Sequence, residues 1–152
     1  MATLTFFHGT MTSGKTTALL QEAHNLRAHG LNAFLLTAAM DSRSGFGVIR
    51  SRIGIEARAE TYVAGEDLLA RIRAAHALHP VIRVLVDEAQ WLSRDQVWQL
   101  SDVVDELGIE VSCYGLRSDF RGELFTGSAA LMAIADHLIE MTGICANCSK
   151  AA

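Results

Sequence analysis

The sequence predicts an α/β fold in which a mainly parallel central sheet is the middle of three layers. Short apolar runs typical of buried strands alternate with segments whose apolar residues recur at helical spacing. Residues 9–16, GTMTSGKT, form a complete phosphate-binding loop between the first predicted strand and the first predicted helix. This order of strand, loop and helix is typical of P-loop NTPase folds.

The N-terminal segment predicts a strand followed by a helix. Residues 4–7 are an apolar run before the phosphate loop. From Lys15 onward, Leu19, Ala23 and Leu26 fall on one helical face. A strand that leads through a phosphate loop into a helix is the structural context that the loop requires.

Two more strands and a second helix follow. Residues 32–38 and 59–63 are short apolar segments that predict strands. The second helix is expected after residue 65, with Glu66 and Asp67 in its first turn. Pro80 ends this helix because its ring disfavours helical geometry in the preceding residue.

The most strand-like run is residues 81–86, and a third helix follows it. Ser93 and Gln96 have the spacing of a capping box, which predicts where this helix begins. Gly108 suits the end of the helix. The last two predicted strands are residues 109–114 and 137–141.

Two long charged stretches, residues 39–58 and 115–127, do not resemble packed elements and are predicted to be loops. Both are consistent with solvated surface loops. In a nucleotide-binding α/β fold, however, ligands bind at the carboxyl ends of the strands, where such loops lie. We therefore interpret both stretches as functional.

Composition limits the possible partners. With 152 residues and half of them hydrophobic, the chain is long enough for one globular domain. The net charge of −4 argues against a nucleic-acid partner. No apolar run is long enough to span a bilayer and no secretory signal is present, so neither membrane association nor export is expected. The predicted localisation is cytoplasmic.

The phosphate loop predicts a small free nucleotide as ligand, bound with Mg²⁺. Gly9 and Gly14 allow the backbone N–H groups to turn inward around a phosphate. Lys15 adds a positive charge for the outer phosphates, and the hydroxyl of Thr16 is placed for Mg²⁺. The helix N-terminus adds its partial positive charge.

The acidic pair Asp87 and Glu88 follows directly after a predicted buried strand. Asp87 is placed to orient Mg²⁺ opposite Thr16. Glu88 can polarise a water in a hydrolase or accept a hydroxyl proton in a kinase. The structural alternative is that Glu88 only caps the following turn through Gln90 and Ser93, and we favour the catalytic role.

The three cysteines do not predict a disulfide framework. Cys113 falls inside an apolar strand and is expected to be a buried core thiol. Cys145 and Cys148 form a C-x-x-C pair, which alone is a weak zinc signal because a structural site needs four ligands. A metal-free thiol pair and a zinc site completed by another chain both remain open. His8 is expected to be packed or solvated rather than catalytic.

A series of motifs, in this order, resembles the cellular-type (type II) thymidine kinases. The motifs are GTMTSGKT at 9–16, DSR at 41–43, DEAQ at 87–90, YGLR at 114–117, DFRGE at 119–123, F-x-G-S at 125–128 and C-x-x-C at 145–148. The resemblance covers the whole chain. It implies transfer of the γ-phosphoryl group of ATP to the 5′-hydroxyl of thymidine, with residues 1–143 as the kinase core and 144–152 as the start of a zinc-binding subdomain.

The resemblance also implies roles for individual residues. Glu88 would be the catalytic base, Thr16 and Asp87 would bind Mg²⁺, and Cys145 and Cys148 would be two of four zinc ligands. ATP and its phosphates would be bound by Gly9, Thr10, Met11, Thr12, Ser13, Gly14, Lys15, Thr16, Asp87, Glu88, Ala89 and Gln90. Thymidine would be bound by Met11, Asp41, Arg43, Trp91, Leu116 and Phe120, where Trp91 replaces the more usual Phe of the family.

The family closes its site with a lid that follows the first C-x-x-C pair, and the sequence ends before such a segment. Three origins remain open: an artificially shortened chain, an incomplete gene product or a natural short form. The alternative function is therefore a nucleotide-binding module with little transfer. A P-loop ATPase motor is disfavoured by the acidic charge. The resemblance further implies a homo-oligomer, either tetramer or dimer, and inhibition by thymidine triphosphate (dTTP).

Overall fold

The computed structural model describes residues 1–10, 13–39 and 45–142 and contains a seven-stranded sheet in the order β3-β4-β2-β5-β6-β1-β7. All neighbouring strands are parallel except β3 and β4, which pair antiparallel at one edge. The strands are β1 (Leu4–Gly9), β2 (Ala33–Ala38), β3 (Gly45–Arg50), β4 (Glu56–Tyr62), β5 (Arg83–Val86), β6 (Glu110–Gly115) and β7 (His137–Met141).

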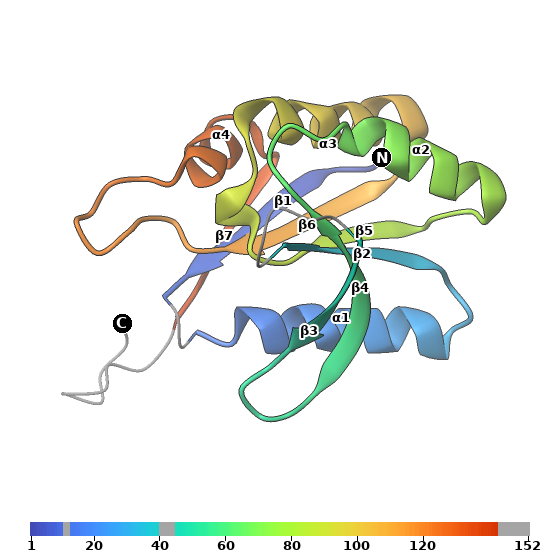
Figure 1. The fold of residues 1–152 in the computed structure, drawn as a ribbon, viewed down its shortest axis with the longest axis horizontal. Helices are drawn as coiled ribbons and strands as arrows, with labels where there is room; N and C mark the ends of the chain where they lie inside the picture. Colours follow the sequence, from blue (N-terminus) through green and yellow to red (C-terminus); the bar gives the residue numbers. More distant parts are fainter. Residues whose placement is uncertain (11–12, 40–44, 143–152) are drawn as a thin grey trace.

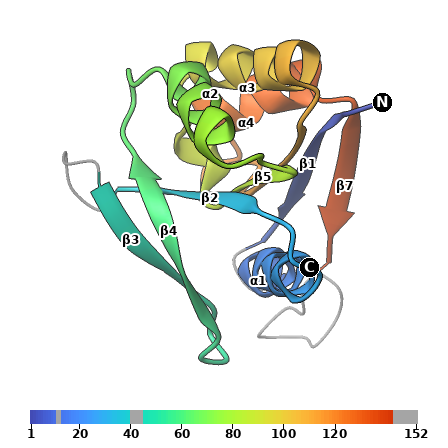
Figure 2. The ribbon, with the colours of Figure 1, turned by 90° about the vertical axis from the view of Figure 1, so that its right-hand side faces the viewer.

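Helices cover both faces of this sheet. Helix α1 (Lys15–Ala28) lies on one face, and α2 (Leu68–Leu78), α3 (Arg94–Leu107) and α4 (Thr126–Ile134) lie on the other, as Figure 1 and the turned view in Figure 2 show. A short 3₁₀ turn, η1 (Ala89–Trp91), follows β5. The arrangement confirms the predicted three-layer α/β fold with a mainly parallel sheet. None of these helices is long and apolar enough to cross a membrane.

Two separate apolar clusters hold the layers together. The larger lies between the sheet and helices α2, α3 and α4 and includes Phe6, Leu100 and Cys113. The smaller lies under α1 and joins Leu19 and Leu20 to strand residues. Removing this apolar surface from water is the main driving force for packing the helices on the sheet. The expected core position of Cys113 is confirmed, and its burial raises the pKa of the thiol.

The helix ends follow the sequence signals closely, with one correction. Ser93 and Gln96 form the predicted capping box at the start of α3, and Gly108 ends this helix in the left-handed conformation. The sequence predicts Asp67 in the first turn of α2, but this residue is the N-cap, where its side chain accepts a hydrogen bond from the Ala70 backbone N–H. An aspartate suits that position because it satisfies an otherwise unpaired amide.

The predicted loop at residues 39–58 is wrong for its second half. Residues 45–62 form the β3–β4 hairpin, and β4 begins three residues before the strand expected at 59–63. This hairpin lies at the edge of the sheet, where one face is exposed to solvent, so charged residues interrupt the apolar pattern. The second charged stretch, residues 115–127, is largely a loop between β6 and α4, as predicted.

The strand register brings the ends of β1, β5 and β6 together. Cys113 of β6 lies opposite Phe6 of β1 on one side and Val86 of β5 on the other. The phosphate loop after β1 and the acidic pair after β5 therefore emerge at the same edge of the sheet. The predicted boundary between a core at 1–143 and a zinc-binding subdomain at 144–152 lies outside the described residues.

Candidate nucleotide-binding site

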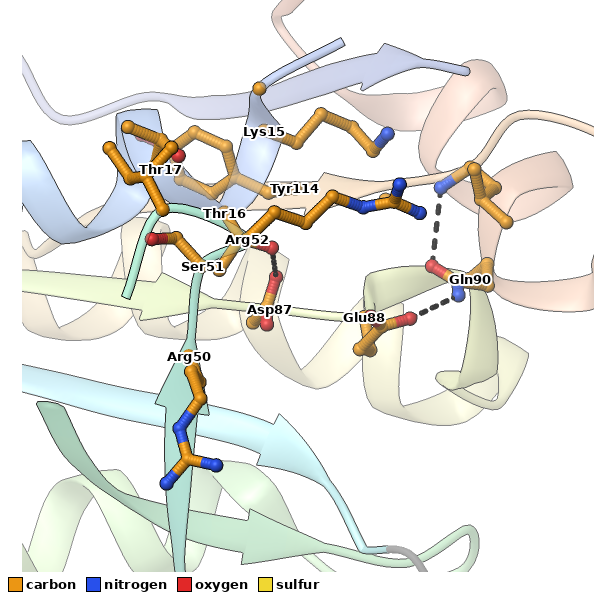
Figure 3. Close-up of a pocket in the computed structure, with 14 residues that line it drawn as sticks. Lys15, Thr16, Thr17, Arg50, Ser51, Arg52, Asp87, Glu88, Gln90 and Tyr114 are labelled. Carbon is orange, nitrogen blue, oxygen red and sulfur yellow. Dashed lines mark hydrogen bonds between the residues drawn. The ribbon is translucent and has the colours of Figure 1, made fainter. Parts of the chain in front are cut away.

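A pocket of about 400 Å³ opens at this edge of the sheet (Figure 3). Four segments line it: the start of α1, the turn of the β3–β4 hairpin, the residues after β5, and the end of β6 with the following residue. The lining residues are 14–17, 50–53, 87, 88, 90 and 114–116. A pocket at the carboxyl ends of parallel strands is the usual ligand position in an open α/β sheet.

The phosphate loop turns sharply into α1. Gly14, the N-cap of the helix, has a φ of 80°, a left-handed conformation that a glycine adopts without steric cost. The ammonium group of Lys15 donates hydrogen bonds to the carbonyl oxygen of Thr10, to that of Gly9 at 3.3 Å and to Ser13 Oγ at 3.1 Å. The loop and the first turn of α1 thus direct a cation and a helix N-terminus toward one pocket, a combination that suits an anion.

The electrostatic environment of Lys15 is mixed. Burial lowers the pKa of its ammonium group, the carboxylates of Glu88 and Asp87 act in the opposite direction, and the guanidinium of Arg52 lowers it further. These effects place two cations and two carboxylates within electrostatic reach of each other. Such a cluster can balance both the negative charge of phosphates and the positive charge of a metal ion.

Asp87 is buried beside Thr16. The Thr16 hydroxyl donates a hydrogen bond to Asp87 Oδ1 at 3.3 Å, and Asp87 is only 7% exposed. Burial and the neighbouring Glu88 raise the pKa of Asp87 to about 6, although the Glu88 backbone amide, Thr16 and Lys15 oppose this. A hydroxyl and a carboxylate are hard oxygen ligands of the kind that Mg²⁺ prefers, and Mg²⁺ commonly takes one or two protein ligands together with phosphates.

Glu88 has an unusual backbone. Its φ of 55° and ψ of 40° are left-handed, and it is the only non-glycine residue with positive φ in the described part of the chain. The Tyr62 hydroxyl, on a residue that is 1% exposed, donates a hydrogen bond to the Glu88 carbonyl oxygen at 2.7 Å. Backbone strain of this kind costs on the order of 1–3 kcal/mol and persists only where surrounding contacts hold it.

The side chain of Glu88 is held by Gln90 and does not cap η1. Gln90 Nε2 donates to Glu88 Oε2 at 2.5 Å, while Gln90 Oε1 accepts from the Leu116 backbone N–H at 3.2 Å. Glu88 makes no side-chain cap hydrogen bond at the start of η1, but its contact with Gln90 is part of what the structural alternative expects, so the choice between the two roles stays a prediction. The carboxylate is instead oriented within the pocket by a buried amide (Figure 3).

Comparison with known proteins identifies the family. The family described as Thymidine kinase matches residues 2–152. The chain belongs to the thymidine kinase family. Thymidine kinases of Jannaschia sp. (strain CCS1) and Novosphingobium aromaticivorans are each 55% identical over the full chain, which spans 77% and 79% of their lengths. The thymidine kinase of Vibrio cholerae is 49% identical and the chain again covers 79% of it.

The family match confirms the resemblance seen in the sequence and the prediction of an ATP-dependent thymidine kinase. The alternative of a binding module without transfer has no support among these relatives. The pocket brings together seven of the predicted site residues: Gly14, Lys15, Thr16, Asp87, Glu88, Gln90 and Leu116. Gly9, Thr10 and Ser13 contact the Lys15 side chain, and Ala89 is buried in η1.

Two of the predicted thymidine-binding residues do not line the pocket. The Trp91 ring packs edge-on against Phe125 with centroids 5.1 Å apart. Phe120 is 97% exposed, with the guanidinium of Arg121 5.7 Å from the centroid of its ring. Their roles stay predictions. Six other predicted site residues lie outside the described residues: Met11, Thr12, Asp41, Arg43, Cys145 and Cys148.

His8, next to the phosphate loop, is buried and its ring lies 5.5 Å from that of Phe6. Burial and the charge of Arg117 lower its pKa, while Glu140 opposes this. The prediction of a packed histidine is confirmed. In the described part of the chain, no group of three or more His, Cys, Asp or Glu residues could hold a metal ion.

Sequence reasoning missed the hairpin turn and Tyr114 as parts of the site. Residues 50–53 line the pocket, and Tyr114 stacks on Phe7 with ring centroids 4.6 Å apart. The sequence indicates a functional role for the charged stretch at 39–58, but its arginines could not be placed without the hairpin. The signal in the sequence that could have indicated this part of the site was the pair of nearby arginines, Arg50 and Arg52.

We expect Tyr62→Phe to lower the free energy of unfolding by about 1–2 kcal/mol, because it leaves the Glu88 carbonyl without its buried donor. Urea unfolding would measure the difference. Tyr114→Phe is a matched control, since Tyr114 is also buried but stacks through its ring. A stability loss no greater than that of the control would show that the Tyr62 hydroxyl does not hold Glu88.

We expect the stability of an Asp87→Asn variant, relative to the parent, to rise with pH. An unfolded aspartate titrates near pH 3.9, whereas Asp87 in the folded protein titrates at about 6. Between these values the folded protein binds more protons, so parental stability falls as the pH rises. At 1.36 kcal/mol per pKa unit, the relative gain between about pH 4 and pH 7 is about 3 kcal/mol.

The measurement is urea unfolding of both proteins across this pH range, without nucleotide and with a metal chelator. Asp102→Asn, which removes an exposed carboxylate on α3, controls for the loss of one charge. A stability difference for Asp87→Asn that does not change with pH, or that falls, would contradict the stated effect of burial.

Proposed function

We propose that this protein transfers the γ-phosphoryl group of ATP to the 5′-hydroxyl of thymidine, giving thymidine monophosphate and ADP. The single observation that supports this best is the oriented Glu88 carboxylate, which faces the same pocket as the phosphate loop. A carboxylate beside bound phosphates can accept the proton of an acceptor alcohol, and the relatives named above are thymidine kinases.

The phosphate loop would hold the triphosphate. Its backbone N–H groups and the N-terminus of α1 supply partial positive charge, and Lys15 can leave the loop carbonyls to meet the outer phosphates. Thr16 and Asp87 would hold Mg²⁺, since their oxygens are 3.3 Å apart and the raised pKa of Asp87 reflects a carboxylate that a cation would stabilise. The bound ion would neutralise charge on the transferred group.

In the transfer step, the 5′-oxygen forms a bond to the γ-phosphorus as the bond between that phosphorus and the ADP oxygen breaks. Glu88 takes the proton of the 5′-hydroxyl, and ADP leaves with the electron pair of the broken bond. Gln90 keeps the carboxylate pointed at the pocket through its two hydrogen bonds. This orientation matters for the rate, because a misplacement of about 1 Å in the reacting geometry can cost about 10²-fold.

The thymine would lie beyond the acidic pair, toward the loop after β6. Leu116 supplies an apolar lining there, and the exposed ring of Phe120 offers a face on which a base can stack. On the resemblance alone, Met11 and Trp91 are proposed for this side of the site, and Asp41 and Arg43 are proposed to bind thymidine beside the reacting phosphate. Four further proposals also rest on the family resemblance: assembly into a dimer or tetramer, inhibition by dTTP, zinc on the C-x-x-C pair and a cytoplasmic location.

The direct test is to incubate the protein with Mg²⁺, labelled ATP and thymidine, with parallel reactions containing deoxycytidine or no nucleoside. We expect thymidine monophosphate from thymidine and little product from deoxycytidine. Release of ADP without any nucleoside product would identify an ATPase and overturn the proposal.

Glu88→Gln should reduce turnover by about 10²–10⁴-fold, the usual contribution of a positioned general base, while ATP binding stays close to that of the parent. Turnover in the same assay and calorimetric titration with ATP would separate the two effects. Glu106→Gln is the matched control because Glu106 is exposed on α3 and paired with Arg73. Turnover of Glu88→Gln equal to the control would remove Glu88 from the mechanism.

A further inference from the structure

The turn between β3 and β4 is firmly built. The Ser51 backbone N–H donates to the Ile55 carbonyl oxygen at 2.8 Å, the Ile55 N–H donates to Ser51 Oγ at 3.2 Å, and the Gly54 N–H donates to the Ser51 carbonyl oxygen at 3.1 Å. Ser51 is 5% exposed although its neighbours are exposed. Arg52 therefore projects from a turn whose base is fixed by three hydrogen bonds.

The hairpin is anchored over the helix that follows the phosphate loop. Ile49 of β3 and Ala59 of β4 are buried in the same apolar cluster as Leu19 and Leu20 of α1. A turn anchored in this way has a defined position relative to the start of α1. This explains how residues 50–53 come to line the pocket with residues 14–17.

The two arginines of this turn differ in their partners. Arg50 forms an ion pair with Glu56 at 2.8 Å, and Figure 3 shows its side chain directed away from Lys15. Arg52 instead extends into the pocket, with its guanidinium on the side of Lys15 and Glu88 (Figure 3). Its charge acts on Lys15, and it has no hydrogen-bond or ion-pair partner within the part of the chain that the structure describes.

We propose that Arg52 is a further catalytic residue, which binds the outermost phosphate of ATP and stabilises the charge on the transferred group. The inference rests on the proposed kinase reaction. A guanidinium suits this role because its planar array of donors can hold two phosphate oxygens at once, whereas Lys15 acts as a point charge. The hairpin thereby places a second cation opposite the carboxylates of Asp87 and Glu88.

A purely structural role does not explain Arg52. Arg52 is exposed and is a member of neither apolar cluster. Burial is the main cause of the lowered pKa of Lys15, and the nearby charge of Arg52 lowers this pKa further. The repulsion between the two cations is relieved when an anion lies between them. The arrangement therefore favours a highly charged ligand, such as a triphosphate, over a neutral one.

The test compares Arg52→Gln, Arg52→Lys and the control Arg73→Gln, which removes an exposed arginine from α2 that is paired with Glu106. Steady-state turnover would be measured with thymidine and ATP. Binding of a non-hydrolysable ATP analogue and of ADP, both with Mg²⁺, would be measured by calorimetry. Thermal unfolding of each variant would show that the fold is retained.

We expect Arg52→Gln to lower kcat by about 10²–10³-fold, the usual loss on removing one preorganised donor to transition-state charge, with little change in KM for thymidine. Affinity for the ATP analogue should fall about tenfold and affinity for ADP less than about twofold, because only the outermost phosphate is contacted. Arg52→Lys should recover part of kcat, and Arg73→Gln should behave like the parent.

Turnover of Arg52→Gln within about threefold of the parent, or equal losses of affinity for the ATP analogue and ADP, would overturn the role of Arg52. If the parent itself forms no thymidine monophosphate, the proposed kinase reaction fails. In that case, comparing how much affinity Arg52→Gln loses for the ATP analogue and for ADP would still decide whether Arg52 contacts the outer phosphate.

Discussion

Two consecutive carboxylates must serve one pocket, and a regular strand cannot place them there. Successive side chains along a strand point to opposite faces of the sheet. Asp87 directly follows the last residue of β5 and is buried against Thr16, so an extended residue 88 would direct its carboxylate to the other face. The left-handed backbone of Glu88 breaks this alternation. Tyr62 holds the strained carbonyl and Gln90 holds the carboxylate, so both acids face the phosphate loop.

The charges of the site come from different parts of the fold. The carboxylates follow a central strand, Lys15 begins a helix on one face, and Arg52 comes from an edge hairpin. Burial makes the ionised form of Asp87 costly, and the adjacent Glu88 adds to this cost. The folded protein tolerates the pair because neighbouring donors and cations partly offset it. A charge distribution of this kind favours ligands that bring both a metal ion and phosphates.

Much of the fold could be predicted from local sequence signals. The phosphate loop, the capping box at Ser93 and the strand before Asp87 are each specified by a few adjacent residues. The structure has the strand, the capping box and the left-handed glycine that leads from the loop into α1. These signals are reliable because their physical causes are local: a glycine conformation, a helix cap and an apolar run.

What could not be predicted depends on contacts between distant segments. The β3–β4 hairpin has an exposed face whose charges obscure the strand pattern, so the sequence alone predicts a loop around Arg50 and Arg52. The hydrogen bond from Tyr62 to Glu88 joins two segments whose strands are not neighbours in the sheet. The family resemblance indicates Glu88 and Leu116 as candidates, and both line the pocket, but it does not indicate that Trp91 packs on Phe125.

The register of the β3–β4 hairpin affects the position of its turn at the pocket as well as the packing of the sheet. In the observed register Ile49 lies opposite Ala57, and Arg50 lies opposite Glu56. A slip by one residue would reverse which side chains of β3 face α1, so Ile49 would leave the apolar cluster. The same slip would draw the turn away from the start of α1. The register of one edge strand pair thus determines whether the charge of Arg52 reaches the pocket.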